Sequence, residues 1–420
     1  MKVQFGFGRG YQEADISEKN LLSVLEPGRL PSFPDEQKIL QEALSAPIGT
    51  KRLREIVHPG QKIAIVTSDI SRPCPSMKIL PAVVEELSSA GIEDRDITIT
   101  FALGSHRHMT DQEREYLAGK EIFSRIVCRD SSPDDTVRIG STGRGMDVSI
   151  DRTVMEADRR ICIGNVEYHY FAGFSGGAKA IFPGCSTPAS IAMNHRWMID
   201  PESFAGSLDE NPVRQDLEEA AGLAGVDFIV NVVLNPEKEI VYAACGDMKK
   251  AHRAACYYLA GAYACRIPRE ADIVIVSQGG YPKDLNLYQM QKALDNARYA
   301  VRKGGTVILV GSAKEGFGNA VFQEWMLSGR SPQQMLADLH RNFVLGGHKA
   351  AAIARVKEKA DIFFVSDMDP AIVQRTMLKP YASLTDAYRD ALAKYGCDAS
   401  LIAMPYGGST LPVLAAGSGK

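Results

Sequence analysis

The chain has 420 residues, 45% of them hydrophobic and 24% charged, a composition typical of a folded globular protein of about two or three domains. Its formal net charge is −3, from 48 basic and 51 acidic residues, so it has no excess of positive charge for nucleic acid or an anionic membrane surface. No stretch approaches the roughly 18 consecutive apolar residues of a membrane span.

Short apolar runs of β type alternate with helical patterns, which is typical of parallel α/β layers. The sequence predicts, in chain order, strands at 62–68, 96–103, 124–128, 159–164, 226–234, 273–277, 306–311, 362–366 and 400–404. It predicts helices at 77–90, 111–118, 251–264, 287–302, 332–342 and 384–395. The pattern restarts near 266–271, so we expect two α/β domains with mainly parallel sheets, at 1–268 and 269–420.

The eight cysteines are scattered, and none stands in a CxxC pair. Neither a zinc ribbon nor a dithiol redox motif is therefore supported. The N-terminus lacks the apolar stretch of a signal peptide, and free thiols suit a reducing compartment. We expect a cytoplasmic protein that binds neither nucleic acid nor a membrane.

Polar and glycine residues crowd four loops at the carboxyl ends of predicted strands, where open α/β sheets bind their ligands. The first loop is DISRPCPS at 69–76. Arg72 can bind a carboxylate or phosphate with two parallel hydrogen bonds, and the following helix start adds N–H groups that favour an anion. An equally good interpretation of this loop alone is a surface ion pair between Asp69 and Arg72.

The second loop, LGSHRHMT at 103–110, contains His106 and His108 beside a glycine. Imidazole titrates near neutral pH, so either histidine can supply an acid–base group or a metal ligand. The alternative is a helix start capped by Thr110, with both histidines exposed.

The third loop, YHYFAGFSGGAKAIFPG at 168–184, is hard to explain as packing. Gly176 and Gly177 permit a ligand to approach the backbone closely. Lys179 follows them, but no GK[ST] occurs, so this is not a Walker A loop. A lysine in a mostly apolar setting can be desolvated and nucleophilic. Another histidine, His195, follows downstream.

The fourth loop, at 277–292, leads into the first helix of the second domain. Tyr288 and Lys292 share one face of that helix, and Gln289 lies one position round. A phenol, an amide and an ammonium suit a small hydroxy acid, whereas the alternative is an ordinary exposed helix face.

Five segments occur together in one order: DISRPCPS at 69–76, GSHRHMT at 104–110, HYFAGFSGGAKAIFPG at 169–184, NH at 194–195 and GGYPKDLNLYQMQKA at 279–293. Through them the chain resembles the nickel-pincer lactate racemase family across both predicted domains. The resemblance implies two α/β domains with an active-site cleft between them. One departure is that Ile70-Ser71 replaces the His-Thr of the family pattern DHTRP.

The resemblance also implies roles for individual residues. Lys179 matches the lysine that carries nickel(II) pyridinium-3,5-bisthiocarboxylic acid mononucleotide through a covalent thioamide, and His195 matches the metal ligand. His106 and His169 match a pair of acid–base histidines. Contacts with the cofactor are implied for Asp69, Ile70, Ser71 and Arg72. Contacts with the substrate are implied for Arg72, Gln289 and Lys292, to which the helix-face argument adds Tyr288.

The expected activity is a racemase or epimerase of 2-hydroxy acids. The carboxylate makes the α-proton of such an acid very weakly acidic, so hydride transfer through a 2-oxo acid avoids a carbanion. Lactate is the first substrate to expect, and malate, hydroxyglutarate or a sugar acid are the alternatives. Cofactor-biosynthesis proteins are the expected partners in maturation.

Two other classes compete with this expectation. A zinc hydrolase would use His106, His108, His169 and His195, but the chain has no HExxH motif. A solute-binding protein would bind its ligand between two α/β lobes without chemistry, but the chain shows no signal peptide.

Overall fold

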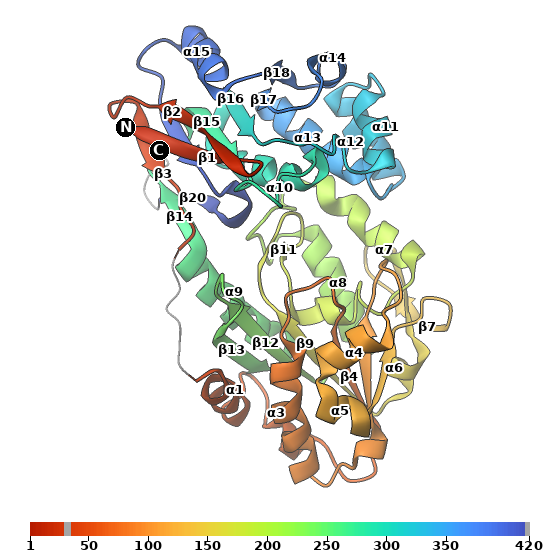
Figure 1. Ribbon diagram of the computed structural model, residues 1–420. Coiled ribbons are helices and arrows are strands. Elements are labelled where there is room, and N and C mark those ends of the chain that lie inside the picture. The colour runs from red at the N-terminus through yellow and green to blue at the C-terminus, as the bar shows by residue number, and fades with distance from the viewer. Residues whose placement is uncertain (29–34, 416–420) are drawn as a thin grey trace. The chain divides into compact units, whose positions relative to one another are not determined.

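The computed structural model describes residues 1–28 and 35–415, which form two compact units (Figure 1). We call Arg29–Ala262 the middle unit, and Met1–Gly28 with Tyr263–Lys420 the terminal unit. The boundary expected at 268/269 lies close to the end of the middle unit. Residues 1–28, which the sequence placed in the first domain, group by their contacts with the C-terminal part of the chain.

The middle unit is built on a six-stranded sheet in the order β13 (Ile240–Gly246), β12 (Phe228–Leu234), β9 (Arg159–Asn165), β4 (Ile63–Ser68), β5 (Ile97–Ala102) and β6 (Val127–Asp130). All neighbouring strands are parallel except β12 and β13, which pair antiparallel at one edge. The remaining strands form two hairpins, β7 (Thr136–Ser141) with β8 (Asp147–Asp151), and β10 (Tyr168–His169) with β11 (Gly173–Phe174).

Helices surround this sheet. They are α1 (Glu36–Ser45), α2 (Leu53–Ile56), α3 (Ser76–Ser89), η1 (Asp94–Asp96), α4 (Asp111–Ala118), α5 (Lys120–Arg125), α6 (Arg152–Glu156), η2 (Gly177–Ala180), α7 (Pro188–His195), η3 (Arg196–Ile199), α8 (Pro212–Ala224) and α9 (Met248–Tyr263). Alternate residues of β4, β5, β9 and β12 point to one face of the sheet and pack against α1 to α5 in one apolar cluster. This alternation follows from the two-residue period of a strand.

The terminal unit has a second six-stranded sheet, which is parallel throughout. Its order is β18 (Lys379–Tyr381), β17 (Asp361–Val365), β16 (Val301–Val310), β15 (Ala271–Ser277), β19 (Leu401–Met404) and β3 (Leu21–Val24). The other elements are β1 (Lys2–Phe7), β2 (Gly10–Asp15), β14 (Ala264–Ile267), α10 (Leu287–Ala297), α11 (Ala320–Leu327), α12 (Pro332–Arg341), α13 (Gly347–Lys359), α14 (Pro370–Val373), α15 (Leu384–Tyr395), η4 (Gly407–Ser409) and β20 (Leu411–Leu414).

The N-terminal hairpin explains why residues 1–28 belong to the terminal unit. In Figure 1 the red strand β1 lies beside β15 and β16, while β2 contacts α15, and apolar side chains of this hairpin share a buried cluster with the sheet and α15. The buried carboxylate of Asp284 accepts hydrogen bonds from the N–H groups of Gly8, at 2.7 Å, and Ser312, at 3.0 Å. A Cβ on Gly6 would lie 2.5 Å from the backbone nitrogen of Gly280, so the hairpin packs directly on the loop after β15.

Most predicted elements are confirmed, including the helices at 111–118 and 384–395 with the same bounds. The strand predicted at 124–128 is displaced, because α5 continues to Arg125 and β6 begins at Val127. The helix predicted at 287–302 ends at Ala297, and the chain enters β16 at Val301. In the described part of the chain, no helix is long and apolar enough to cross a membrane.

The core under the site loops is testable at Phe101, which is fully buried in β5. Phe101→Ala leaves a cavity and should lower the free energy of unfolding by about 3–5 kcal/mol. Val127→Ala on the neighbouring strand, where the side chain is 61% exposed, should change it by less than about 0.5 kcal/mol. Urea unfolding followed by circular dichroism measures both, and equal losses in the two variants would contradict this core.

Candidate functional site

Three of the predicted loops leave neighbouring strands of the middle unit at the same edge. In register, β4 pairs parallel with β5 on one side and β9 on the other. The carboxyl ends of parallel strands meet at one edge, where α/β sheets bind their ligands. The loops at 69–76 and 103–110 follow β4 and β5 directly, and the loop at 168–184 begins shortly after β9.

Asp69 and His106 form the first cluster of the site. Asp69 is 3% exposed, and its Oδ2 lies 2.8 Å from Nδ1 of the half-exposed His106. Ser71 Oγ donates to the other carboxylate oxygen of Asp69 at 2.7 Å and lies 3.1 Å from His106 Nδ1. An ionised carboxylate accepts the Nδ1 proton, so the neutral imidazole has its lone pair on Nε2.

Neighbouring groups stabilise the ionised form of the Asp69 carboxyl. Burial raises the pKa of this carboxyl, but hydrogen bonds from His106 and Ser71 and the positive charge of Arg72 outweigh it, so the pKa lies below its ordinary value. The Arg72 N–H donates to the Asp69 carbonyl at 3.2 Å, while its side chain is exposed. Ile70 packs on the core and directs its N–H toward Met109 Sδ.

His108, in the same loop as His106, lies apart from this cluster. Its Nδ1 is 3.2 Å from Asp130 Oδ2, and its side chain is 74% exposed. Thr110 caps the following helix by accepting from the N–H of Glu113, as the sequence predicts. The two histidines of the HxH segment therefore have different environments.

The ring of Phe171 brings together three predicted site residues. It is 4% exposed and contacts His169 edge to face at 4.5 Å between ring centroids, and His195 at 4.9 Å. The Lys179 Nζ lies 5.9 Å from the centre of the same ring. The Ala172 N–H donates to His169 Nδ1 at 3.2 Å, so the neutral ring of His169 carries its proton on Nε2.

Burial strongly affects the protonation of this group. It lowers the pKa of the Lys179 ammonium well below its ordinary value, and the positive charges of Arg214 and Arg72 lower it further. Burial likewise lowers the pKa of His169 well below its ordinary value, with added contributions from the positive charges of Lys179, His195 and Arg72. Burial therefore favours the uncharged form of each group relative to the same group exposed to water.

His195 is the last residue of α7 and is oriented by its chain neighbour. The buried Asn194 donates its amide N–H groups to the Val213 carbonyl and to Asp216, both at 3.1 Å. Its Oδ1 is thus an acceptor, and it lies 3.2 Å from His195 Nδ1. The Nδ1 proton leaves the lone pair on Nε2, which is the form in which an imidazole binds a metal.

Two buried side chains, Asn231 and His252, hold the glycine-rich turn before Lys179 in place. Gly176 and Gly177 have φ values of +74° and +59°, where side chains are strained, and a Cβ on Gly177 would lie 2.8 Å from the ring of His252. Asn231 Oδ1 accepts the Gly177 N–H at 2.8 Å. The fully buried His252 donates from Nε2 to the Ser175 carbonyl at 2.8 Å.

The turn that carries Phe171 is held by two residues at the start of α8. Asn211 donates its amide to the Phe171 carbonyl at 2.8 Å. Arg214, which has no exposed surface, donates to the carbonyls of Ala172 and Phe174. Burial lowers the pKa of its guanidinium to about 10.

The remaining predicted contacts lie in the terminal unit, on the first turns of α10. Asn286 caps this helix by accepting from the N–H of Gln289 at 3.1 Å. Gln289 and Lys292 are exposed, whereas Tyr288 is half-buried with its ring edge to face with Phe322. The predicted cleft shared by the two units stays a prediction.

Sequence reasoning missed several buried polar residues that support the site: Arg214, Asn231, His252 and, beneath Tyr288, Lys349. Lys349 is 5% exposed, donates to Gln291 Oε1 at 2.8 Å and lies over the Tyr288 ring at 5.3 Å. Burial and then the charge of Lys292 lower the pKa of Lys349 to about 7. A polar residue inside an apolar or amphipathic run is the only signal that the sequence offers for such positions.

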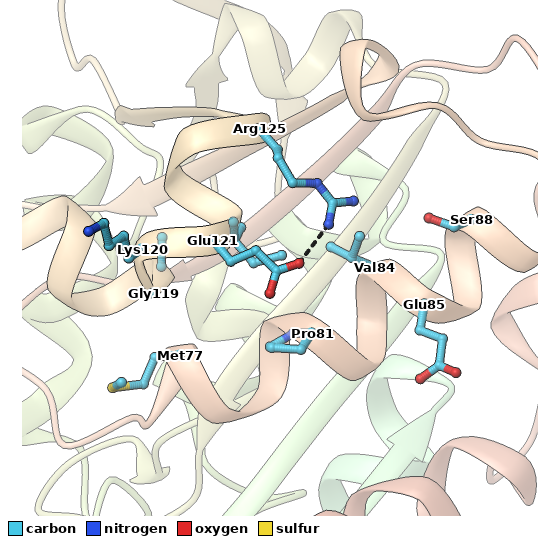
Figure 2. A pocket seen from close by; sticks show the side chains of 11 residues that line it. Met77, Pro81, Val84, Glu85, Ser88, Gly119, Lys120, Glu121 and Arg125 are labelled. Carbon is cyan, nitrogen blue, oxygen red and sulfur yellow. Dashed lines mark hydrogen bonds and ion pairs between the residues drawn. The ribbon is translucent and has the colours of Figure 1, made fainter.

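Two further observations concern binding. Within residues 1–28 and 35–415, no three His, Cys, Asp or Glu side chains gather to hold a metal ion. A surface hollow of about 380 Å³ lies between α3 and the α4–α5 turn, as Figure 2 shows, with the ion pair of Arg125 and Glu121 beside it. This hollow contains none of the predicted site residues.

Comparison with known proteins shows that both the N-terminal and the C-terminal parts of the chain are similar to lactate racemases. Residues 7–206 match the family model of the lactate racemase N-terminal domain, and residues 267–411 match that of the lactate racemase C-terminal domain. The lactate racemase of Thermoanaerobacterium thermosaccharolyticum is 30% identical over 421 residues, covering 97% of this chain and 98% of the relative. That of Lactiplantibacillus plantarum is 33% identical over 383 residues, covering 89% and 90%.

Solved structures agree. The lactate racemase apoprotein from Thermoanaerobacterium thermosaccharolyticum matches with a TM-score of 0.87 at 29% identity, covering 98% of this chain and 100% of that chain. A protein from Thermotoga maritima matches with a TM-score of 0.63 at 19% identity, covering 93% of this chain and 100% of that chain. The second similarity shows the fold alone.

The glycine turn provides a test of the site's construction. Gly177→Ala forces a side chain into the left-handed region and against His252, and should lower the free energy of unfolding by about 1–3 kcal/mol. The matched control is Gly222→Ala in α8, where nothing lies within 4 Å of the added Cβ. It should stabilise by about 0.5–1 kcal/mol. Thermal unfolding of both variants checks this, and an unchanged Gly177→Ala protein would refute the close packing.

Proposed function

Because the chain belongs to the lactate racemase family, we propose that it inverts the α-carbon of a small 2-hydroxy acid by hydride transfer through a 2-oxo acid. Family membership makes the protein a racemase, which sets aside the zinc hydrolase and the solute-binding protein. The observation that carries the proposal is the cluster around Phe171. There the amine of Lys179, whose pKa is lowered by burial, and the imidazoles of His169 and His195 lie around one apolar ring.

The proposed cofactor is nickel(II) pyridinium-3,5-bisthiocarboxylic acid mononucleotide, attached to Lys179. The described residues fit such a group in three ways. The paired glycines, both with positive φ, allow the tight turn that packs on Asn231 and His252 directly before Lys179. Arg214 NH1 and the amide nitrogens of Asn165 and Asn231 are buried without a hydrogen-bond partner among the described residues, and donors of this kind suit a nucleotide rich in acceptors.

A third feature of the fit is His195, whose Nε2 lone pair suits nickel(II). Asp69, Ile70, Ser71 and Arg72 are the other proposed cofactor contacts. When bound, the group supplies an electrophilic ring that accepts a hydride from the α-carbon. The chain's own residues then have to move the hydroxyl proton and hold the carboxylate.

Two histidines are proposed to move that proton. His106 is suited to accept it, because Asp69 holds the Nδ1 proton and stabilises the imidazolium that forms on Nε2. His169 presents a neutral ring with its proton on Nε2, since the Ala172 N–H engages Nδ1. We propose that each histidine accepts the hydroxyl proton of one enantiomer, and that His169 does so after its proton leaves Nε2 and the Ala172 N–H releases Nδ1. Inversion requires an acceptor on both sides, because the hydroxyl proton leaves on one side and returns on the other.

The carboxylate of the substrate requires cations. Arg72 offers an exposed guanidinium beside Asp69, and Lys292 an exposed ammonium on α10. We propose that these two hold the carboxylate, with Gln289 and Tyr288 contacting the rest of the acid. Lactate is the proposed substrate, and malate, hydroxyglutarate or a sugar acid are the alternatives within the same chemistry.

The setting proposed for the enzyme is the cytoplasm, with no nucleic-acid or membrane partner. All eight cysteines are free, as suits a reducing compartment. Cofactor-biosynthesis proteins are the proposed partners in maturation. A host without them should therefore yield the apoprotein, with Lys179 unmodified.

The function is tested with holoenzyme, single enantiomers of lactate, malate, 2-hydroxyglutarate and gluconate, and chiral chromatography. We expect conversion of one acid, lactate first, to a mixture of its two α-carbon configurations. Lys179→Ala should abolish both the covalent mass increase and the conversion, because no other group replaces the attaching amine. The control Lys120→Ala, at an exposed site on α5, should keep both. A Lys179→Ala protein with wild-type turnover would refute the assignment.

The two-histidine arrangement predicts complementary defects. His106→Ala and His169→Ala should each fail to complete inversion, and should oxidise opposite enantiomers in a single turnover, because each variant lacks the proton acceptor on one side. The yield of 2-oxo acid from each enantiomer measures this. His108→Ala, which lies apart beside Asp130, should behave as wild type. The same enantiomer preference in both variants would exclude the model.

A further inference from the structure

Ser71 contacts both members of the pair formed by Asp69 and His106. Its Oγ lies 2.7 Å from Asp69 Oδ1 and 3.1 Å from His106 Nδ1. Asp69 Oδ2 contacts the same imidazole nitrogen at 2.8 Å. Two oxygens, one from the carboxylate and one from the hydroxyl, therefore meet at Nδ1, and the hydroxyl also holds the second carboxylate oxygen.

The direction of each hydrogen bond follows from the protons that are available. The ionised carboxylate of Asp69 has no proton to give, so the Ser71 hydroxyl donates its single proton to Oδ1. Toward His106 the same oxygen can then only accept, and the Nδ1 proton is shared by Asp69 Oδ2 and Ser71 Oγ. A proton taken up at Nε2 leaves both of these bonds in place.

A serine, a histidine and an aspartate together raise the question of a hydrolytic triad. In such a triad the serine and the aspartate contact opposite nitrogens of the imidazole, so that the ring can take the serine proton. Here both contact Nδ1, which already carries a proton. The geometry therefore suits orientation of the ring, and does not suit activation of Ser71 as a nucleophile.

Asp69 alone would hold the ring loosely. The torsion about the Cβ–Cγ bond of an aspartate is broad, so a carboxylate with only one bonded oxygen can turn. Ser71 fixes Oδ1 and thereby directs Oδ2 at His106. The His106 side chain is 39% exposed, so its orientation depends more on these hydrogen bonds than on packing. The Arg72 N–H closes a turn on the Asp69 carbonyl at 3.2 Å, which places the serine within reach of the carboxylate.

We propose that Ser71 is a positioning residue for His106: its hydroxyl fixes the Asp69 carboxylate and accepts from Nδ1–H, so that the ring presents Nε2 to the substrate. The inference deepens the proposed function, because it rests on the proposed role of His106 as a proton acceptor. The effect belongs to the hydroxyl and not to the rest of the side chain. Threonine should therefore replace serine, whereas alanine should not.

The first test measures the mobility of the His106 ring by 13C relaxation in full-length apoprotein labelled with 13C-histidine. We expect an order parameter of about 0.85 in the wild type, as in a rigid group, and below about 0.6 in Ser71→Ala. Ser71→Thr should keep the wild-type value. The matched control is Ser124→Ala, which removes an exposed hydroxyl bonded to the Glu121 carbonyl at 2.8 Å and should change nothing. An equally rigid ring in Ser71→Ala would overturn the proposal.

The second test measures the single-turnover yield of 2-oxo acid from each enantiomer of lactate with holoenzyme. Ser71→Ala should slow oxidation of one enantiomer about tenfold, because the imidazolium loses a hydrogen-bond acceptor. This should be the enantiomer that His106→Ala fails to oxidise, and the other should react at the wild-type rate. Ser71→Thr should restore both. A purely structural role, or a contact with the cofactor alone, would slow both enantiomers equally, and that result or unchanged rates would contradict the proposal.

These tests separate a failure of this inference from a failure of the proposed function. The mobility of the ring in the apoprotein requires neither cofactor nor substrate. A holoenzyme that inverts no 2-hydroxy acid would refute the function and leave the result on the ring intact. Equal slowing of both enantiomers in an active holoenzyme would refute only the role of Ser71.

Discussion

The parallel pairing of β9, β4 and β5 is the constraint on which the candidate site depends. Parallel neighbours end at the same edge of the sheet, so the chain leaves all three strands on one side. That geometry brings together the loops of Asp69, His106 and Lys179, which are far apart in the sequence. An antiparallel neighbour at any of these positions would direct one loop to the opposite edge. The apolar cluster under α1 to α5 holds the pairing in place.

Beyond that edge, the protonation of the site residues depends on the apolar ring of Phe171. An acidic side chain at this position would have the opposite effect. Phe171 contacts Lys179 and two histidines and offers them no negative charge. A carboxylate at that position would favour the ammonium and imidazolium forms. The one acid in the neighbouring cluster, Asp69, is engaged by His106 and Ser71. The cluster around Asp69 therefore stabilises charged side chains, whereas the cluster around Phe171 disfavours them.

Much of this architecture could be predicted from the sequence, because β-branched runs and helix caps are local signals. Thr110 marks a helix start that the structure confirms. Arg214 was missed because it lies in an amphipathic helix among other charged residues, and only the fold shows that it faces inward. Asn231 is hidden in the same way within the apolar strand β12. The cofactor, the proton-moving roles and the contacts of Lys292 still rest on family resemblance, since no local physical pattern specifies them.

The pairing of the N-terminal segment 1–28 with the C-terminal part of the chain has a consequence for biosynthesis. Strand β3 pairs with β19, in which Leu401 is the partner of Leu21. That edge of the sheet therefore cannot form until β19 has left the ribosome. The middle unit contains all partners of its own sheet and can fold first, as N-terminal parts of nascent chains commonly do. The segment 1–28 meanwhile stays tethered with its strand edges unpaired, which is a hazard for aggregation. A fragment cut at 268/269 would keep this segment but remove its sheet, whereas an internal fragment that follows the bounds of the middle unit would contain every strand of its own sheet.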